Sequence, residues 1–331
     1  MPSMGVVGSR LKKLVSSFDV LNFDLSLQRP AVVPSFDLKG VAGVLRSASN
    51  VVVMTGAGIS TATGLPDFRS RGSGLYASES ASGLGVERPE DAFSIAHFEA
   101  NPEAFYTLAR DLWPSSDILP TATHHFLALL EAKGKLRRAY TQNVDSLELI
   151  AGLSPENVVQ VHGHFRSACC VTNGLSVPIE ELHAAVLSGS ETCASLVAKY
   201  GGPVKPDLIF FGEPLPPRAL ARASDDFAAC DLLLIIGTTL CVEPFAELCT
   251  RVGVDVPRLV INRERVEYRA PQSSEAQMLG FDDTSLHFDE GNHRNIEWLG
   301  DCDDGVQQLA ALMGWQQELH QRCYRGDRPG T

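Results

Sequence analysis

The sequence contains no long hydrophobic run. It is 44% hydrophobic over 331 residues, which is enough for a sizeable core. No apolar stretch approaches the roughly 20 residues that a membrane-spanning helix needs. The first 18 residues lack a continuous apolar segment, so secretion is not expected. These residues carry basic side chains and no acid, a weak similarity to a transit peptide, and we interpret residues 1–35 as an N-terminal extension.

Positive charge is also scarce. Lysine and arginine total 28 against 40 acidic residues, which gives a net charge of -12. This balance argues against non-specific nucleic-acid binding and is compatible with lysine-bearing protein partners, although ordinary solubility explains it equally well. The eight cysteines form no small disulfide framework. We therefore expect an intracellular protein, cytoplasmic or nuclear, with a mitochondrial location left open.

Residues 51–69 contain the most informative pattern. The apolar, β-branched run 51–54 is typical of a strand buried on both faces of a parallel sheet. The glycine-rich turn 56–58 and the expected helix start at 59–63 together predict a phosphate-binding turn. Thr61 stands where the ordinary dinucleotide fingerprint has its third glycine. Taken alone, such a turn occurs in many α/β proteins.

An acid, an aromatic ring and a cation follow this turn at Asp67, Phe68 and Arg69. Their position beside a phosphate turn favours a ligand-binding loop. Residues 70–90 are rich in serine and glycine, and a loop of this length beside a binding turn suggests a lid.

The remaining pattern predicts an α/β fold with a Rossmann-like, doubly wound parallel sheet and a smaller inserted domain. Further strands are expected at 137–142, 158–161, 207–211, 231–236 and 258–261. Helices are expected at 36–47, 91–112 (two), 123–133, 147–151, 179–187 and 306–313, with Ser146 capping the helix at 147. Residues 166–204 differ in composition and are interpreted as an insert, after which 207–211 is expected to return to the main sheet.

These expectations divide the chain into three regions. The N-terminal extension ends at residue 35, a catalytic domain covers 36–316, and 317–331 form a C-terminal tail. Within the domain, the Rossmann-like part is expected at about 36–75, 121–165 and 206–316, and the small domain at about 76–120 and 166–205.

The predicted strands end in small or hydrogen-bonding residues. In an open parallel sheet, ligands bind beyond these carboxyl ends, so the endings together predict one polar crevice for a nucleotide-type ligand. His162 is the one histidine that follows a buried strand in this set, and it can act as a general base near neutral pH. We assign no role to the other eight histidines.

Seven motifs occur in a fixed order along the chain. They are Gly56 to Ser60, Gly64 to Arg69, Thr141 to Asp145, His162-Gly163, Val204 to Asp207, Phe210 to Glu213 and Gly237 to Leu240. This set resembles the sirtuins, the NAD-dependent protein deacylases, over about residues 37–315. The segment Leu299 to Asp303 is most similar to the eukaryotic cytosolic and mitochondrial deacetylase branch.

The resemblance implies NAD as cofactor and an acyl-lysine protein as substrate, with histones among the candidates, and neither nucleic acid nor membrane as a partner. It implies His162, Asn143 and Asp145 as catalytic residues. The implied NAD-binding residues are Gly56, Ala57, Gly58, Ser60, Thr61, Asp67, Phe68, Arg69, Tyr76, Gln142, Asn143, Val144, Asp145, Gly237, Thr238, Thr239, Asn262, Arg263, Glu264 and Cys302. The substrate peptide would lie as a strand contacted by Ile209, Phe211, Val242 and Glu243.

The family mechanism then implies that the acyl oxygen attacks the nicotinamide ribose and nicotinamide leaves. His162 would next activate a ribose hydroxyl, and the products would be free lysine and O-acyl-ADP-ribose. Two alternatives stay open: an NAD-dependent mono-ADP-ribosyltransferase, and a catalytically weak sirtuin fold that serves as a binding module.

The chain departs from the family at the metal site. Sirtuins usually carry two Cys-x-x-Cys pairs after the histidine, whereas Asn173, Leu196 and Tyr200 occupy positions where thiolates are expected here. Cys170 and Cys193 are the only plausible remnants of a zinc site, with Cys169 and His183 as further donors. We therefore expect a degenerate zinc-ribbon-like module that is held by packing and contains no zinc.

Overall fold

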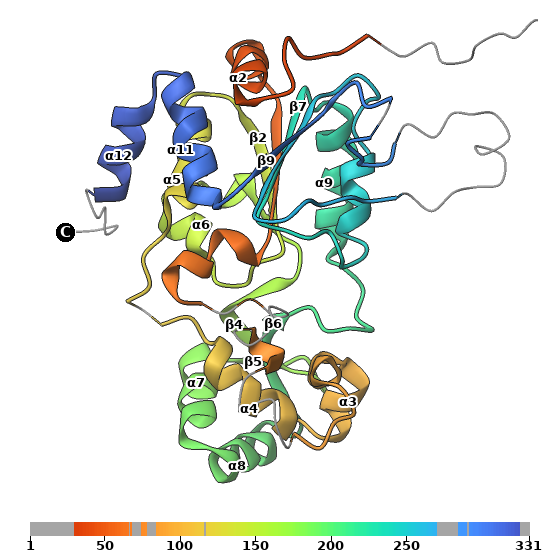
Figure 1. Cartoon of the computed structure of the whole chain (residues 1–331). Coiled ribbons are helices and arrows are strands. Elements are labelled where there is room, and N and C mark those ends of the chain that lie inside the picture. Colours follow the sequence, from red (N-terminus) through yellow and green to blue (C-terminus); the bar gives the residue numbers. More distant parts are fainter. Residues whose placement is uncertain are drawn as a thin grey trace, which may run out of the picture.

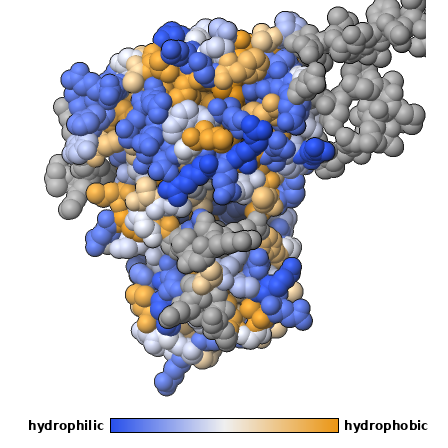
Figure 2. All heavy atoms as spheres, viewed as in Figure 1, coloured by the Kyte–Doolittle hydropathy of each residue, from blue (hydrophilic) through white to orange (hydrophobic). Residues whose placement is uncertain are grey.

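The computed structural model describes residues 30–65, 67, 74–77, 84–115, 117–269, 284–289 and 291–324. Figure 1 shows a larger part with a central sheet between helices and a smaller part below it. Among the described residues, no helix has the length and apolarity needed to span a membrane. On the face drawn in Figure 2, hydrophilic residues cover much of the larger part, and hydrophobic residues are scattered between them.

The larger part is built on a six-stranded parallel sheet in the order β3-β2-β1-β7-β8-β9. Its strands are β1 (Val51–Thr55), β2 (Leu136–Thr141), β3 (Val158–Gln160), β7 (Leu232–Ile236), β8 (Arg258–Asn262) and β9 (Asn295–Leu299). This arrangement confirms the predicted Rossmann-like sheet. The strand order reverses between β1 and β7, where ligands bind in folds of this kind.

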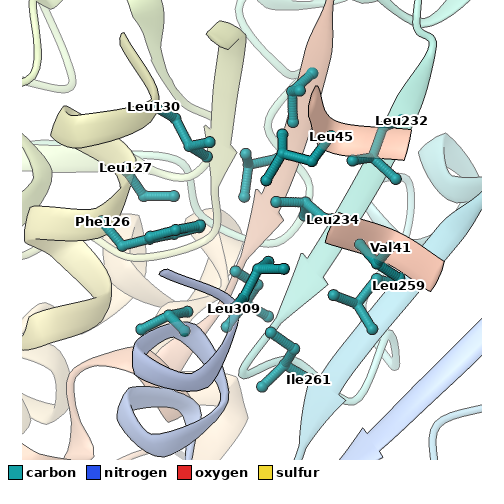
Figure 3. Close-up of a cluster of buried hydrophobic side chains, with 14 of the residues drawn as sticks. Val41, Leu45, Phe126, Leu127, Leu130, Leu232, Leu234, Leu259, Ile261 and Leu309 are labelled. Carbon is teal, nitrogen blue, oxygen red and sulfur yellow. The ribbon is translucent and has the colours of Figure 1, made fainter. Parts of the chain in front are cut away.

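Alternate side chains of each central strand enter two different cores. Val51 and Val53 face α2 (Leu38–Ser47), α5 (Ala122–Ala132), α11 (Cys302–Leu312) and α12 (Gln316–Tyr324), as Figure 3 shows for part of this cluster. Val52 and Met54 face the other side, with Phe227 of α9 (Pro217–Ala228). Because both faces are covered, β7 is apolar throughout and β1 is apolar except for Thr55, as the sequence predicted for the strand at 51–54.

The smaller part contains a three-stranded antiparallel sheet in the order β5-β4-β6. Its strands are β4 (Gly163–Cys170), β5 (Ser176–Val177) and β6 (Val204–Leu208), and its helices are α3 (Ile95–Ala100), α4 (Glu103–Leu112), α7 (Ile179–Ser188) and α8 (Ser190–Tyr200). The prediction that residues 207–211 return to the main sheet is wrong, because Leu208 pairs with Gly163 in this small sheet. The apolar residues after it serve a different purpose: Phe210 packs against Phe93 and Phe105.

A buried carboxylate joins strand β2 of the large sheet to α9. Asp226 of α9 is 2% exposed. It accepts hydrogen bonds from Arg137 Nε and the Tyr140 hydroxyl, each at 2.8 Å, and from Arg138 Nε. Each carboxylate oxygen therefore has a charged partner, which offsets the cost of burying the charge.

Candidate active site

The carboxyl ends of the large sheet open into a cavity of about 690 Å³ that also reaches the smaller part. Most of the site residues expected from the sequence line it. They are Ala57, Gly58, Thr61, Asp67, Tyr76, Gln142, Val144, His162, Ile209, Phe211, Gly237, Thr238, Thr239, Val242, Asn262, Arg263, Glu264 and Cys302. The structure therefore brings together residues that lie up to 245 positions apart in the sequence.

Five expected site residues lie outside the cavity lining: Gly56, Ser60, Asn143, Asp145 and Glu243. The Glu243 carboxylate instead accepts the Tyr268 hydroxyl at 2.7 Å. The other four lie directly behind the lining. Phe68 and Arg69 fall outside the described residues.

The glycine turn after β1 packs closely against the backbone that follows β7, where the strand order reverses. The Gly58 N–H donates to the Gly237 carbonyl at 2.8 Å. A Cβ atom on Gly58 would lie 2.7 Å from Gly237 Cα, and Gly237 itself has φ of 64°. Two short 3-10 turns, η1 (Ala57–Ile59) and η2 (Thr61–Thr63), follow in place of a regular helix. Glycine is therefore required here by the neighbouring strand as well as by any ligand.

Ser60 is the centre of a hydrogen-bond cluster behind the cavity. Its hydroxyl donates to Asp145 Oδ2 at 2.7 Å, and Asn143 Nδ2 donates to Ser60 Oγ at 3.2 Å. Asp145 Oδ1 accepts from the Leu147 backbone N–H at 2.9 Å. Both oxygens of Asp145 thus act as acceptors, which is the pattern of an ionised carboxylate.

His124, to which the sequence gave no role, joins this cluster from α5. The Thr121 backbone N–H donates to His124 Nδ1 at 3.1 Å, so Nδ1 carries no proton. The proton of the neutral ring therefore lies on Nε2, which is 3.5 Å from Ser60 Oγ. Complete burial lowers the pKa of His124 to about 3, so the ring is neutral at physiological pH. Its signal in the sequence was the third position after a Thr N-cap.

The expected cap of the short helix α6 (Leu147–Ile150) is wrong. Ser146 has φ of 63° and makes no side-chain cap; its hydroxyl accepts from Gln160 Nε2 at 2.9 Å. Asp145 supplies the oxygen that the helix start needs, through the bond from the Leu147 N–H. The same carboxylate thus orders α6 and the Ser60 cluster.

Gln142 provides a donor that fits a bound nucleotide. Its Oε1 accepts from the Thr238 hydroxyl at 2.9 Å, which fixes the amide orientation. Its Nε2 is buried and makes no hydrogen bond to the described residues. A buried amide donor without a partner is costly, so a ligand oxygen in the cavity would stabilise it. This observation fits a ribose-bearing group such as NAD.

His162 lies between the two sheets, after β3 and directly before β4. Its Nδ1 is 3.2 Å from the Gln142 carbonyl, which can only accept, so this contact places the proton of the neutral ring on Nδ1. Nε2 is then the basic nitrogen. Burial lowers the pKa of His162, and the carbonyl contact offsets part of this shift. The neutral, proton-accepting form therefore predominates at pH 7.

The cavity wall in the smaller part is apolar. Phe93, Leu112, Leu208 and Phe210 line the cavity beside Tyr76, and the sequence had not marked them as site residues. Segment 208–213 is held by Lys205, whose ammonium donates to the Leu208 carbonyl at 2.7 Å and lies 3.1 Å from the Glu213 carboxylate. Of the four apolar lining residues, only Phe210 belonged to a recognised motif. Their shared apolar character predicts room for an uncharged substrate group.

The opposite end of the cavity is acidic. Asp301, Asp303, Asp304 and Gln307 line it and were also missed. Arg263 forms an ion pair with Asp301 across this end. Asp303 accepts from the Thr123 hydroxyl at 2.6 Å, which anchors α11 to α5.

Two of the expected zinc donors, Cys170 and His183, have other partners in the structure. Cys170 Sγ and Asn173 Nδ2 both donate to the Tyr200 carbonyl, at 3.6 and 2.8 Å. His183 stacks on Trp113, with ring centroids 4.4 Å apart. Within the described ranges, no three His, Cys, Asp or Glu side chains gather as metal ligands. These residues therefore do not fit a structural zinc site, which requires four ligands.

We predict that the purified protein contains far less than one zinc per chain and keeps its activity in a strong chelator. The physical reason is that Asn173, Leu196 and Tyr200 stand where thiolates are expected, so the four ligands that a structural zinc site requires are incomplete. Metal content can be measured by mass spectrometry before and after chelation. A stoichiometric zinc, with activity lost on chelation and restored by zinc, would identify Cys169, Cys170, Cys193 and His183 as ligands after all.

Fold and cavity together define a class of protein. A parallel sheet whose strand ends surround a cavity at the reversal of strand order is the arrangement of nucleotide-binding α/β enzymes. His162 lies where the polar strand ends meet the apolar wall of the smaller part. The cavity therefore has an apolar compartment beside its polar one.

The comparisons place the chain in a family. The model of the Sir2 family matches residues 56–244, more than half of the chain. NAD-dependent protein deacetylase sirtuin-2 of Danio rerio is 39% identical over 303 residues, covering 89% of this chain and 76% of that protein. NAD-dependent protein deacetylase sirtuin-3 of Mus musculus is 42% identical over 288 residues, covering 86% and 78%. The chain belongs to the Sir2 family, which confirms the resemblance found in its motifs.

A fungal relative shows the same extent of similarity. NAD-dependent protein deacetylase hst2-1 of Emericella nidulans is 37% identical over 292 residues, covering 88% of this chain and 73% of that protein. All three relatives are eukaryotic deacetylases, in agreement with the branch indicated by residues 299–303.

Proposed function

We propose that the chain is an NAD-dependent protein deacetylase that removes acyl groups from lysine side chains. Its membership of the Sir2 family and the names of its relatives support this activity. The observation that carries the proposal is the position of His162, a neutral base on a cavity with a polar and an apolar compartment.

NAD would occupy the polar compartment. The turn 56–58 would contact its phosphates at Ala57, because the Gly56 and Gly58 N–H groups already donate to the Ile236 and Gly237 carbonyls. Gln142 Nε2 would donate to a ribose oxygen, and Asn262 and Arg263 would contact the adenosine end. When bound, NAD supplies the ADP-ribose that accepts the acyl group and releases nicotinamide.

The Ser60 cluster would position the groups that contact nicotinamide and its ribose. Asp145 fixes the Ser60 hydroxyl, and Ser60 in turn fixes the Asn143 amide. His124 completes the set of contacts to Ser60 Oγ. Because these groups have little rotational freedom, no reorganisation is needed when the substrate binds.

His162 would take a proton at Nε2 from a ribose hydroxyl, which becomes the nucleophile toward the acyl carbon. The Nδ1 contact to the Gln142 carbonyl holds the ring in the tautomer that this step requires. The same contact stabilises the positively charged ring that forms, because a carbonyl oxygen accepts from the charged form as well.

The acyl-lysine would enter from the smaller part, with its peptide strand near Phe211 and Val242. Phe211 is 48% exposed, which leaves its ring accessible to a substrate peptide. Its backbone N–H and carbonyl are already bound to Phe93 and Ile95. The backbone N–H and carbonyl of Phe210 are also bound, both to Glu213. A peptide added as a strand would therefore pair with backbone groups beyond Phe210 and Phe211.

We predict that neutral acyl groups are removed faster than acidic ones. Arg263 is the one cation among the described residues that line the cavity, and Asp301 already pairs with it. A succinyl carboxylate beside Phe93 and Leu112 would be buried without a partner, which should lower kcat/KM by at least about tenfold. Butyryl-lysine peptide, which has the same number of acyl carbons and no charge, is the matched control. Equal kcat/KM for succinyl and butyryl peptides would contradict the prediction.

The function itself can be tested in one incubation. The protein is mixed with NAD and an acetyl-lysine peptide, and the products are identified by mass. The expected products are the deacetylated peptide, nicotinamide and O-acetyl-ADP-ribose. A peptide or protein that gains the mass of ADP-ribose would favour the transferase alternative, and no consumption of NAD would favour a binding module.

A further inference from the structure

A second carboxyl lies behind Asp145, and the site described so far does not use it. Glu148 belongs to α6, three residues after Asp145, and is 0% exposed. Neither of its carboxyl oxygens has a hydrogen-bond partner among the described residues. An ionised carboxylate in this position would be desolvated on all sides, which is strongly unfavourable.

Among the described residues, no cation acts on the Glu148 carboxyl. Burial and the negative charge of Asp145 raise the pKa of Glu148 to about 8, with burial the larger cause. The Thr141 hydroxyl of β2 lies near and lowers this pKa, without a hydrogen bond of normal geometry. The pKa of Asp145 is also raised by burial, but its bonds from Ser60 and Leu147 favour its ionised form. The pair therefore carries one proton near neutral pH, and Glu148 holds it.

We propose that Glu148 is a positioning residue that acts through Asp145: by staying protonated, it keeps a second negative charge away from the Ser60 cluster. This inference rests on the proposed function, because Asp145 and its neighbours are assigned to the NAD-binding site there.

Ionisation of Glu148 would disturb the cluster in a specific way. When the pair loses its single proton, two adjacent buried carboxylates repel each other, and the Asp145 carboxylate is pushed out of position. Its hydrogen bonds from the Ser60 hydroxyl and the Leu147 N–H are then broken or weakened. Ser60 then loses its acceptor, and Asn143, which depends on Ser60, loses its orientation. Activity should therefore fall as Glu148 ionises.

The test compares the wild type with Glu148→Gln, which has the same shape and cannot ionise. Nicotinamide release from NAD and an acetyl-lysine peptide is measured from pH 6 to 9.5. Near pH 7 the variant should keep activity within a few fold of the wild type, because Glu148 is neutral there. Between pH 7 and 9 the ratio of variant to wild-type kcat should rise about tenfold, as expected for loss of a group with pKa about 8.

Glu156→Gln is the matched control. Glu156 is exposed, so its replacement makes the same chemical substitution without touching a buried carboxyl. Its pH profile should follow that of the wild type. If Glu148→Gln does not fold, Glu148→Met provides a second uncharged side chain of similar length. A folded variant of either kind that keeps the wild-type decline above pH 8 would overturn the proposal.

A second measurement requires no catalysis. The folded-state pKa of Glu148 lies above the ordinary glutamate value, so the folded protein binds more protons than the unfolded chain between pH 4.5 and about 8. This contribution to stability is complete below the unfolded pKa and is lost as pH rises through the folded one. The Tm of the wild type minus that of Glu148→Gln should thus decrease from pH 5 to 8.

The Tm measurement distinguishes a failure of the proposed function from a failure of the inference about Glu148. An inactive wild type whose Tm difference still decreases with pH would reject the proposed function and retain the protonated Glu148. A Tm difference that is constant over the same range would overturn the inference, whatever the activity of the protein.

Discussion

Replacement of His162 with alanine is expected to lower deacetylation by roughly 10²–10⁴-fold, the effect of losing a general base. The ring is the one base whose tautomer is fixed at the junction of the polar and apolar compartments. The affinity for NAD, measured by calorimetry, should change little, because the phosphate turn and Gln142 remain. The steady-state rate with an acetyl-lysine peptide provides the main readout.

His164 is the matched control for this experiment. It lies two residues further along β4, is partly buried, and is absent from the cavity lining. His164→Ala should therefore retain most of the activity. Near-native turnover in His162→Ala, combined with an inactive His164→Ala, would show that the wrong histidine has been assigned.

The lowered pKa of His162 also predicts the pH dependence of the wild type. On the acid side, activity should fall at a pH below the usual histidine range.

Replacement of Asp226 with alanine is expected to lower the free energy of unfolding by about 3–5 kcal/mol, as for other broken buried ion pairs. The change leaves Arg137, Arg138 and the Tyr140 hydroxyl without their shared acceptor. Urea denaturation followed by circular dichroism measures the effect. Activity per folded molecule should stay unchanged, because none of these residues lines the cavity.

Tyr140→Phe separates the charged bonds of this cluster from the neutral one. It removes a single neutral hydroxyl and should cost only about 0.5–1.5 kcal/mol. If Asp226→Ala destabilises the protein no more than Tyr140→Phe, the two arginines contribute little to stability.

The sequence predicted the site well where strand ends determine it. Each parallel strand delivers its last residues to the same edge of the sheet, so Gln142, Gly237 and Asn262 meet in one cavity although they are far apart in the chain. Periodicity could not assign residues 207–211, because an apolar run fits a buried strand and an aromatic cluster equally well. The helices α8, α9 and α12 were missed, the last because residues 317–331 were interpreted as a tail. The exposed faces of α8 explain why its apolar pattern is weak.

The buried polar residues of the site could not be predicted from the sequence. His124 and Glu148 are polar residues in helices, and polar residues are usually exposed. In the structure both are 0% exposed. The cap at Ser146 was assigned wrongly for a related reason, since Asp145 satisfies the helix start from one residue earlier. Such contacts depend on three-dimensional neighbours that a linear pattern does not contain.

The continuity of the cavity has a consequence for ligand design. One space joins Asn262 and Arg263 at the end of β8 to Phe93 and Leu112 in the smaller part. A compound that links an adenosine-like group to an apolar amide could occupy both compartments at once. Its second half would bind at the effective concentration set by the linker, which can raise affinity by about 10²–10⁴-fold over either half alone.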